Sequence, residues 1–277
     1  MAKGIGLIGN FKGKVGNMVG YKISDSNTGN TQGIRVYQPI VKNPKTAAQA
    51  EQRAKLAPIN ATYRALKMII DRGNEGLPYG NKSRLAWLKQ AFKASNMPWI
   101  VKGGVVNFPV GCPLTKGSLP GVEIDVADDE FYISCSGVTA ESTFATIGSV
   151  STALKSAYPN LKDGDQVTVV IIGQMSGTLT ADIFSFVIDT TSTEATTKFG
   201  GGAGKIEVNS DIYKIGGAVI VSREGVNGEH LRSTTSIQIN AESLGEAPFD
   251  AASKTAAIES YQSSAASNAD WAEESIQ

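Results

Sequence analysis

The sequence predicts an α+β protein in which a glycine-rich N-terminal β-arm with two or three helices precedes an antiparallel β-sandwich or small barrel and a C-terminal helical tail. Two observations favour this class. Apolar residues recur at helical spacing between about residues 47 and 95. From about residue 105 they gather instead in short β-branched runs separated by turn residues. With 277 residues and 41% apolar residues, the chain can bury a substantial core.

We expect three segments along the chain. Residues 1–103 form a basic β-arm plus helical domain, residues 104–242 an antiparallel β domain, and residues 243–277 an Ala/Ser-rich tail. The boundaries follow the changes in composition and periodicity along the chain.

The arm is predicted from its glycines and from two short apolar runs. Glycine recurs every two to four positions between residues 4 and 20, which disfavours a helix and permits tight turns. Residues 21–23 and 34–37 read as strands joined by the polar loop 24–32. A hairpin this thin is marginally stable by itself, so we expect the arm to pack on the rest of the chain or on a neighbouring subunit.

Two helices follow the arm. Thr46 and Gln49 have the spacing of a capping box, and they start a helix over about 47–71 that Pro58 should split or kink. Its predicted apolar face is Ile59, Tyr63, Leu66 and Ile70. A second helix over about 81–95 is predicted to bury Leu85, Leu88 and Phe92.

Short strands fill the next segment. The predicted strands are 122–126, 131–134, 144–147, 167–172, 183–188, 205–208, 218–222 and 236–239. A short helix is expected near 151–157, and a weak helical face in the tail is formed by Ile258, Tyr261, Ala265 and Trp271.

Neither cysteines nor apolar runs point to secretion or a membrane. Cys112 and Cys135 fit neither a disulfide framework nor a zinc site, so both are expected to be buried free thiols. No run is long enough to cross a bilayer, and the N-terminus lacks the apolar region of a signal peptide. We therefore expect no secretion by a signal peptide.

The net charge of zero hides a strong asymmetry. Residues 1–116 hold 18 Lys and Arg against 4 Asp and Glu, whereas residues 117–277 hold 8 against 22. The two parts are thus +14 and −14, and they should attract different partners or each other. Solvation or head-to-tail self-association explains the asymmetry as well as a polyanion partner does.

The motifs that resemble catalytic or nucleotide-binding signatures lack their required context. Residues 4–9 match G-x-G-x-x-G, but too few residues precede them to form the strand of a dinucleotide-binding unit. The sequence has one histidine, His230, and no G-x-S-x-G motif that would supply the nucleophile of a serine hydrolase. We therefore expect His230 in a loop or at a strand edge. The acidic run Asp128, Asp129 and Glu130 is interpreted as a solvated turn, with weak calcium binding as the alternative. We predict no catalytic residue, cofactor or metal site.

One constellation remains, a basic set interleaved with Tyr21, Tyr37 and Tyr63. Cations near aromatic rings can hold a phosphate backbone and stack bases, or form a docking surface for another protein chain. The candidate contact residues are Lys12, Lys14, Lys22, Arg35, Lys42, Lys45, Arg53 and Lys55.

Three stretches of the chain form recognisable motifs. The sequence is GKVGNMVG over residues 13–20 and VKNPKT over 41–46, followed by Gln49 and Arg53. The third stretch is GAVIVSR over residues 217–223, followed by Asn-Gly and Leu-Arg-Ser. Together they resemble the motifs of a family of unknown function whose members occur in phages and prophages of Bacteroidetes. The resemblance implies a virion-associated or phage-encoded accessory role, a location in a virion or in the cytoplasm of the infected bacterial host, and no catalytic residues. We therefore expect a non-enzymatic structural or assembly protein that contacts copies of itself or other virion proteins, with nucleic-acid binding through the basic N-terminal module as the alternative.

Overall fold

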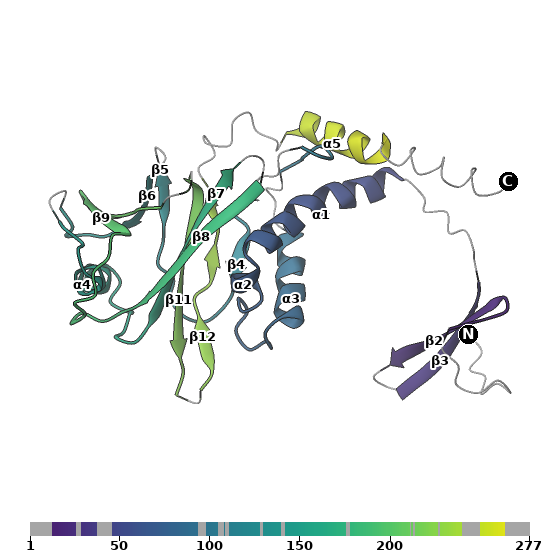
Figure 1. Cartoon of the computed structure of the whole chain (residues 1–277), viewed down its shortest axis with the longest axis horizontal. Coiled ribbons are helices and arrows are strands. Elements are labelled where there is room, and N and C mark those ends of the chain that lie inside the picture. Colours follow the sequence, from purple (N-terminus) through teal and green to yellow (C-terminus); the bar gives the residue numbers. More distant parts are fainter. Residues whose placement is uncertain are drawn as a thin grey trace. The chain divides into compact units, whose positions relative to one another are not determined.

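The computed structural model describes residues 13–25, 29–37, 46–93, 98–104, 108, 111–127, 130–139, 142–175, 178–210, 212, 214–226, 228–239 and 250–263. They form an α+β protein with five helices and several antiparallel sheets, and no sheet within these ranges closes into a barrel (Figure 1). The chain divides into two compact units, Met1–Pro44 and Lys45–Gln277, which we call the arm and the body.

The arm is a three-stranded antiparallel sheet in the order β1-β2-β3. Its strands are β1 (Gly13–Val15), β2 (Met18–Asp25) and β3 (Gly29–Val36). Gly16 has a positive φ of 57° in the turn between β1 and β2, a conformation that favours glycine. The two predicted strands are confirmed and extend further into the intervening segment than expected, to Asp25 and from Gly29.

A five-stranded antiparallel sheet lies at the centre of the body. It has the order β12-β11-β7-β8, and β14 also pairs with β11. Its strands are β7 (Gln166–Met175), β8 (Thr178–Val187), β11 (Lys214–Glu224), β12 (His230–Arg232) and β14 (Gln238–Ile239).

Both faces of this sheet are buried. Val167, Val169 and Ile171 of β7 belong to one hydrophobic cluster, whereas Val170 and Ile172 belong to another. An unbroken apolar run is typical of a strand covered on two faces, and 169–172 is such a run.

The first cluster lies between the central sheet and a smaller sheet of order β5-β6-β10-β9 with its helix α4 (Figure 1). These elements are β5 (Asp125–Ala127), β6 (Glu130–Ser134), β9 (Phe199–Gly202), β10 (Lys205–Val208) and α4 (Ile147–Ala157). The predicted strand over 144–147 is wrong. Thr146 caps α4 there by accepting a hydrogen bond from the Ser149 N–H at 3.3 Å, and Ile147, Val150 and Leu154 are buried at helical spacing.

The second cluster lies under the helices α1 (Ala47–Ala65), α2 (Lys67–Ile70) and α3 (Asn81–Ala91), with β4 (Pro113–Thr115), which pairs with β13 (Thr235–Ser236). These helices therefore share a core with the central sheet. Figure 1 shows them on the side of that sheet opposite α4.

The start of α1 is confirmed and its predicted break is not. Thr46 accepts a hydrogen bond from the Gln49 N–H at 3.3 Å, although the Gln49 side-chain oxygen finds no partner among the described residues. The helix continues through Pro58 and ends at Ala65, and Leu66 separates it from α2. The expected face is correct for Ile59, Leu66 and Ile70, which are fully buried.

The predicted buried stripe of α3 is correct in part. Leu88 and Phe92 are half-buried and pack against the second cluster, whereas Leu85 is exposed. The buried residues of α3 are Ser83, Trp87 and Ala91. The Trp87 indole N–H donates to the Pro113 carbonyl at 2.7 Å, so the polar atom of this buried ring has a partner.

The C-terminal helix α5 (Ala251–Ser263) packs on α1. Asp250 accepts a hydrogen bond from the Ser253 N–H at its start, at 2.6 Å, which lowers the pKa of that carboxyl. Ala257 is its fully buried side chain, and Ala265 and Trp271 of the predicted face lie outside the described residues. Across the described residues no helix is both long and apolar enough to cross a membrane.

Candidate interaction surfaces

The two faces of the arm carry different chemistry because strand pairing sorts its side chains. Lys14 pairs with Val19, and Val19 pairs with Arg35, so these three residues form a row across one face. Met18 pairs with Val36, and Gly20 with Ile34, which places Met18, Ile34 and Val36 on the other face. We call these the basic face and the apolar face of the arm.

The basic face combines two cations with tyrosines. The Lys14 ammonium lies over the Tyr37 ring, 3.6 Å from its centroid, and Arg35 is exposed. Tyr21 lies two residues beyond Val19 on β2 and is also exposed. Cations beside accessible aromatic rings suit a polyanion or an acidic protein surface.

The apolar face of the arm is open to solvent within its unit. Met18, Ile34 and Val36 are 38%, 52% and 64% exposed. A three-stranded sheet needs one covered hydrophobic face to be stable independently. The arm therefore has an exposed apolar face that the described residues of its own unit do not cover.

The eight predicted contact residues fall in both units. Lys14 and Arg35 share the basic face, and Lys22 lies within β2. Arg53 and Lys55 lie on α1. Lys12, Lys42 and Lys45 lie outside the described residues.

Lys55 proves to be part of the body's own packing. Its ammonium is 3.1 Å from the Glu51 carboxylate, which also pairs with Lys254 of α5 at 3.1 Å. Both ammonium groups lie over the Trp99 ring, at 5.6 and 5.1 Å from its centroid. The hydrogen bonds from the two lysines lower the pKa of Glu51. This cluster joins α5 to α1, so the Lys55 charge is already paired within the body.

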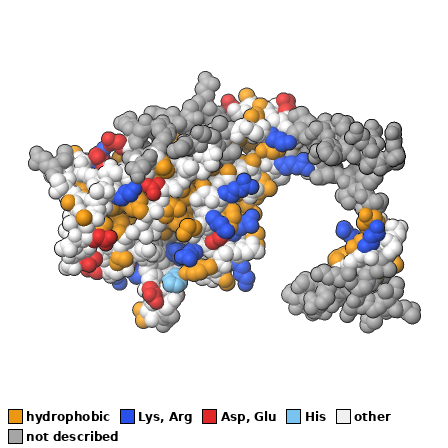
Figure 2. Space-filling view, viewed as in Figure 1, with side chains coloured by type: hydrophobic (Ala, Val, Ile, Leu, Met, Phe, Trp, Pro, Cys, Tyr) orange, Lys and Arg blue, Asp and Glu red, His pale blue; other side chains and the backbone are white. Residues whose placement is uncertain are grey.

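A basic surface on the helices extends further than the predicted residues. Residues 46–93 hold nine Lys and Arg but three Asp and Glu. Of these nine cations, Lys55 is the one that forms a salt bridge within the described residues. Figure 2 shows the blue side chains gathered over the region of α1–α3. Lys82 and Lys89 of α3 and Lys93 just after its end are exposed, so a charge count over 46–93 could have found this surface.

The three acidic residues of this segment, Glu51, Asp71 and Glu75, all form ion pairs or hydrogen bonds within the body. Glu51 pairs with lysines, as above, and Asp71 accepts the Tyr63 hydroxyl at 2.9 Å. Burial and the Asp71 carboxylate together raise the pKa of Tyr63. Two arginines also lie over tyrosine rings, Arg84 over Tyr63 at 4.6 Å and Arg72 over Tyr79 at 5.6 Å.

Glu75 joins three segments of the body. Its carboxylate accepts the backbone N–H groups of Ser118 and Arg232 at 2.9 and 3.0 Å, and the Ser118 hydroxyl. Burial alone would raise its pKa, but these donors outweigh burial and lower it. A shallow groove of about 440 Å³ lies beside it, lined by Gln90 and Lys116 among others. Because Glu75 is fully engaged in holding these segments, it is not poised as an acid or base.

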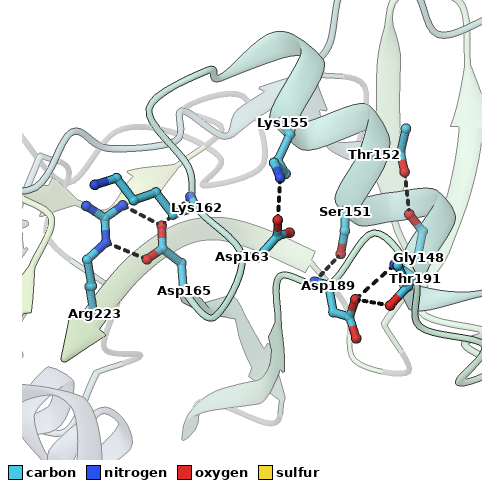
Figure 3. A network of polar contacts seen from close by, with 10 residues as sticks. All are labelled: Gly148, Ser151, Thr152, Lys155, Lys162, Asp163, Asp165, Asp189, Thr191 and Arg223. Atoms are coloured by element: carbon cyan, nitrogen blue, oxygen red, sulfur yellow. Dashed lines mark hydrogen bonds and ion pairs between the residues drawn. The ribbon is translucent and has the colours of Figure 1, made fainter.

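A fully buried carboxylate is equally engaged (Figure 3). Asp165 is 1% exposed and accepts two hydrogen bonds from the Arg223 guanidinium, at 2.6 and 2.7 Å, and one from the Lys162 N–H at 2.8 Å. Nearby, Lys155 of α4 pairs with Asp163 at 2.8 Å. Figure 3 shows these side chains directed at one another around the turn before β7, which they hold in place.

The cysteines, His230 and the acidic run were the other candidates for a catalytic or metal site. Within the described residues they do not come together into such a site. Cys112 and Cys135 are buried free thiols as predicted, and burial raises their pKa values to about 12 and about 11. His230 is an exposed residue of β12, and its ring lies 6.0 Å from that of Tyr79. No metal-binding group of His, Cys, Asp or Glu occurs among the residues that the structure describes, and Asp128 and Asp129 lie outside them. Glu130 pairs with Lys205 at 2.6 Å.

No family model, curated protein or solved structure matches the chain.

Proposed function

We propose that this protein is a non-enzymatic structural or assembly protein that acts through contacts between copies of its own chain. The observation that carries the proposal is the arm, a separate unit whose apolar face, Met18, Ile34 and Val36, is exposed. The body supplies a sandwich-like rigid core of two facing sheets around one hydrophobic cluster. The resemblance to phage and prophage proteins supports a virion-associated role for such an assembly.

Light scattering coupled to size-exclusion chromatography tests self-association over a range of protein concentrations. The full chain is expected to form a defined oligomer. The triple variant M18S/I34S/V36S is expected to weaken association at least tenfold, because the apolar area that contact would bury is removed. A chain that stays monomeric at every concentration overturns the proposal.

The matched control is M68S/L85S/V226S. It also replaces one methionine and two aliphatic side chains with serine, at exposed body positions. Association should be unchanged in this variant. Mass spectrometry of purified phage particles tests the virion role separately, since absence from particles leaves an intracellular assembly role.

The second candidate function is nucleic-acid binding, favoured by the basic surface of the helices. Lys82 and Lys89 of α3 and Lys93 just after its end are exposed, and the arm adds Lys14 and Arg35 beside tyrosines. Each phosphate contact contributes about 0.9 to the slope of log K against log salt on duplex DNA and about 0.7 on single strands.

Two neutralised variants separate the possible DNA contacts. K12Q/K14Q/K42Q/K45Q tests the arm and the segment that follows it, and K82Q/K89Q/K93Q tests the helices. The variant in which log K depends less steeply on log salt than in the unmodified chain identifies the module in contact with DNA. Binding that is absent in the unmodified chain at low salt removes this second function.

A further inference from the structure

The body has one long strand edge without a partner among the described residues. β8 spans ten residues, and its ladder runs from Gln166–Val187 to Met175–Thr178 against β7 alone. The other edges of the body's sheets are formed by strands of four residues or fewer, namely β4, β5, β9, β12, β13 and β14.

This edge lacks the features that normally prevent strand addition. Proteins protect long edges with lysine, proline or a β-bulge. β8 contains neither lysine nor proline, and its pairing with β7 has no register shift over ten pairs. Its one charged residue, Asp182, is held by the Lys198 ammonium at 3.4 Å and by the Ser210 hydroxyl at 3.0 Å.

Each hydrophobic cluster of the body extends to β8, where one of its side chains is partly exposed. Phe184 packs against the first cluster and Ile183 against the second, and both are partly exposed. Adjacent residues of a strand face opposite sides of the sheet. An added strand would therefore extend the cover of both clusters at once.

We infer that the β8 edge binds β3 of the arm of a second copy of this chain as an added antiparallel or parallel strand. This inference rests on the proposed function and names the surface through which the copies meet. β3 has eight residues, pairs only with β2 among the described strands, and so offers a free edge of similar length. The added backbone hydrogen bonds give affinity, as in other strand-addition complexes.

Charge favours this occupant. The arm, residues 1–44, holds six Lys and Arg and one Asp, a net charge of +5, so the remaining residues carry −5. Opposite net charges steer two copies together. Pairing of β8 with β8 of the second copy is less favourable in the antiparallel register that sets Asp182 opposite Asp182, because the two carboxylates then lie side by side on one face of the sheet.

Lysines at the edge test the inference in the full chain. S185K/V187K places two ammonium groups at exposed positions of β8, where they repel a basic arm and protect the edge. The association constant should fall at least tenfold. The control S156K/V226K makes the same two exchanges at exposed positions on α4 and in the β11–β12 hairpin, and it should leave association unchanged.

Hydrogen exchange supplies a readout at the site itself. Amides of β8 should become protected as the concentration of the unmodified protein rises, and M18S/I34S/V36S should abolish that gain. The thermal unfolding of each variant as a monomer verifies its fold. Val187→Lys alone, at the exposed end of β8, is the milder version if the double variant unfolds.

The possible failures differ from one another. Association that survives S185K/V187K but not the arm variant overturns the β8 site and leaves the proposed function intact. Association lost with the lysines but unaffected by the arm variant indicates β8–β8 pairing and overturns the assignment of β3. Protection of β8 in a monomer at every concentration assigns the edge to the chain's own arm, and a monomer without protection removes both proposals.

Discussion

The arm and the body are both built from antiparallel strands, yet they gain stability in different ways. β7 in the body has apolar side chains on two faces, and each face enters its own hydrophobic cluster. β2 and β3 in the arm sort basic and aromatic residues to one face and apolar residues to the other, with both faces open within the unit. Strand pairing alone therefore gives the arm its shape, whereas the body also has a packed interior.

The largest expected effect on the free energy of unfolding is in the body. Trp87→Ala should lower the free energy of unfolding by about 3–5 kcal/mol, because it removes a fully buried indole and its bond to the Pro113 carbonyl. Urea denaturation measures this. Leu85→Ala, at an exposed position of the same helix, should cost about 0.5 kcal/mol or less. Equal costs at the two positions would contradict the orientation of α3.

The next effect concerns the ion pair of Figure 3. Arg223→Met should cost about 3 kcal/mol, because it leaves the buried Asp165 carboxylate without its charged partner. The double variant R223M/D165N should lose less than R223M, since no unpaired buried charge remains. Lys155→Met, which breaks the exposed pair with Asp163, is the control and should cost less than about 1 kcal/mol.

A smaller effect depends on pH. The pKa of Glu75 is lowered in the folded protein, so its contribution is present above the unfolded pKa of about 4.3 and is lost as pH falls through the folded value. Glu75→Gln should cost about 1–2 kcal/mol at pH 7. Denaturation curves from pH 7 to 3 should show the two proteins converging in stability. A constant difference over that range would contradict the role of the carboxylate charge.

The smallest effect on stability is expected in the arm. Ile34→Ser replaces a side chain that is already half exposed, so unfolding of the monomer should change by less than about 0.5 kcal/mol. The same variant should weaken self-association. Chemical denaturation below the association range and light scattering above it separate the two effects. A large loss of monomer stability would show that the arm packs on its own body.

The sequence predicted most of the strands and helices because their periodicity is strong. The β-branched run 167–172 and the cap at Thr46 both led to correct elements. The strand predicted over 144–147 failed because β-branched residues suit a strand as well as a buried helix start, and the Thr146 cap decided for the helix. The stripe of α3 was wrong at Leu85 and missed Trp87, because spacing alone could not show that Trp87 would bond to Pro113, which is distant in sequence.

The candidate surfaces were less predictable than the fold. The charge asymmetry drew attention to the first part of the chain, but it could not show that Lys55 pairs with Glu51 and lies over the Trp99 ring. The opposite faces of the arm follow from strand register, which depends on turn geometry and pairing. The bare β8 edge is a property of sheet order, and no local pattern in the sequence reports which strand lies outermost.

The β8 edge, which has no partner strand among the described residues, has a consequence for stoichiometry. The strand that would donate and the strand that would accept lie in different units of the same chain, so each copy that receives an arm still has its own arm to offer. Such a head-to-tail contact does not limit the number of copies. The angle between successive copies then decides whether the series closes into a ring or grows as an open filament.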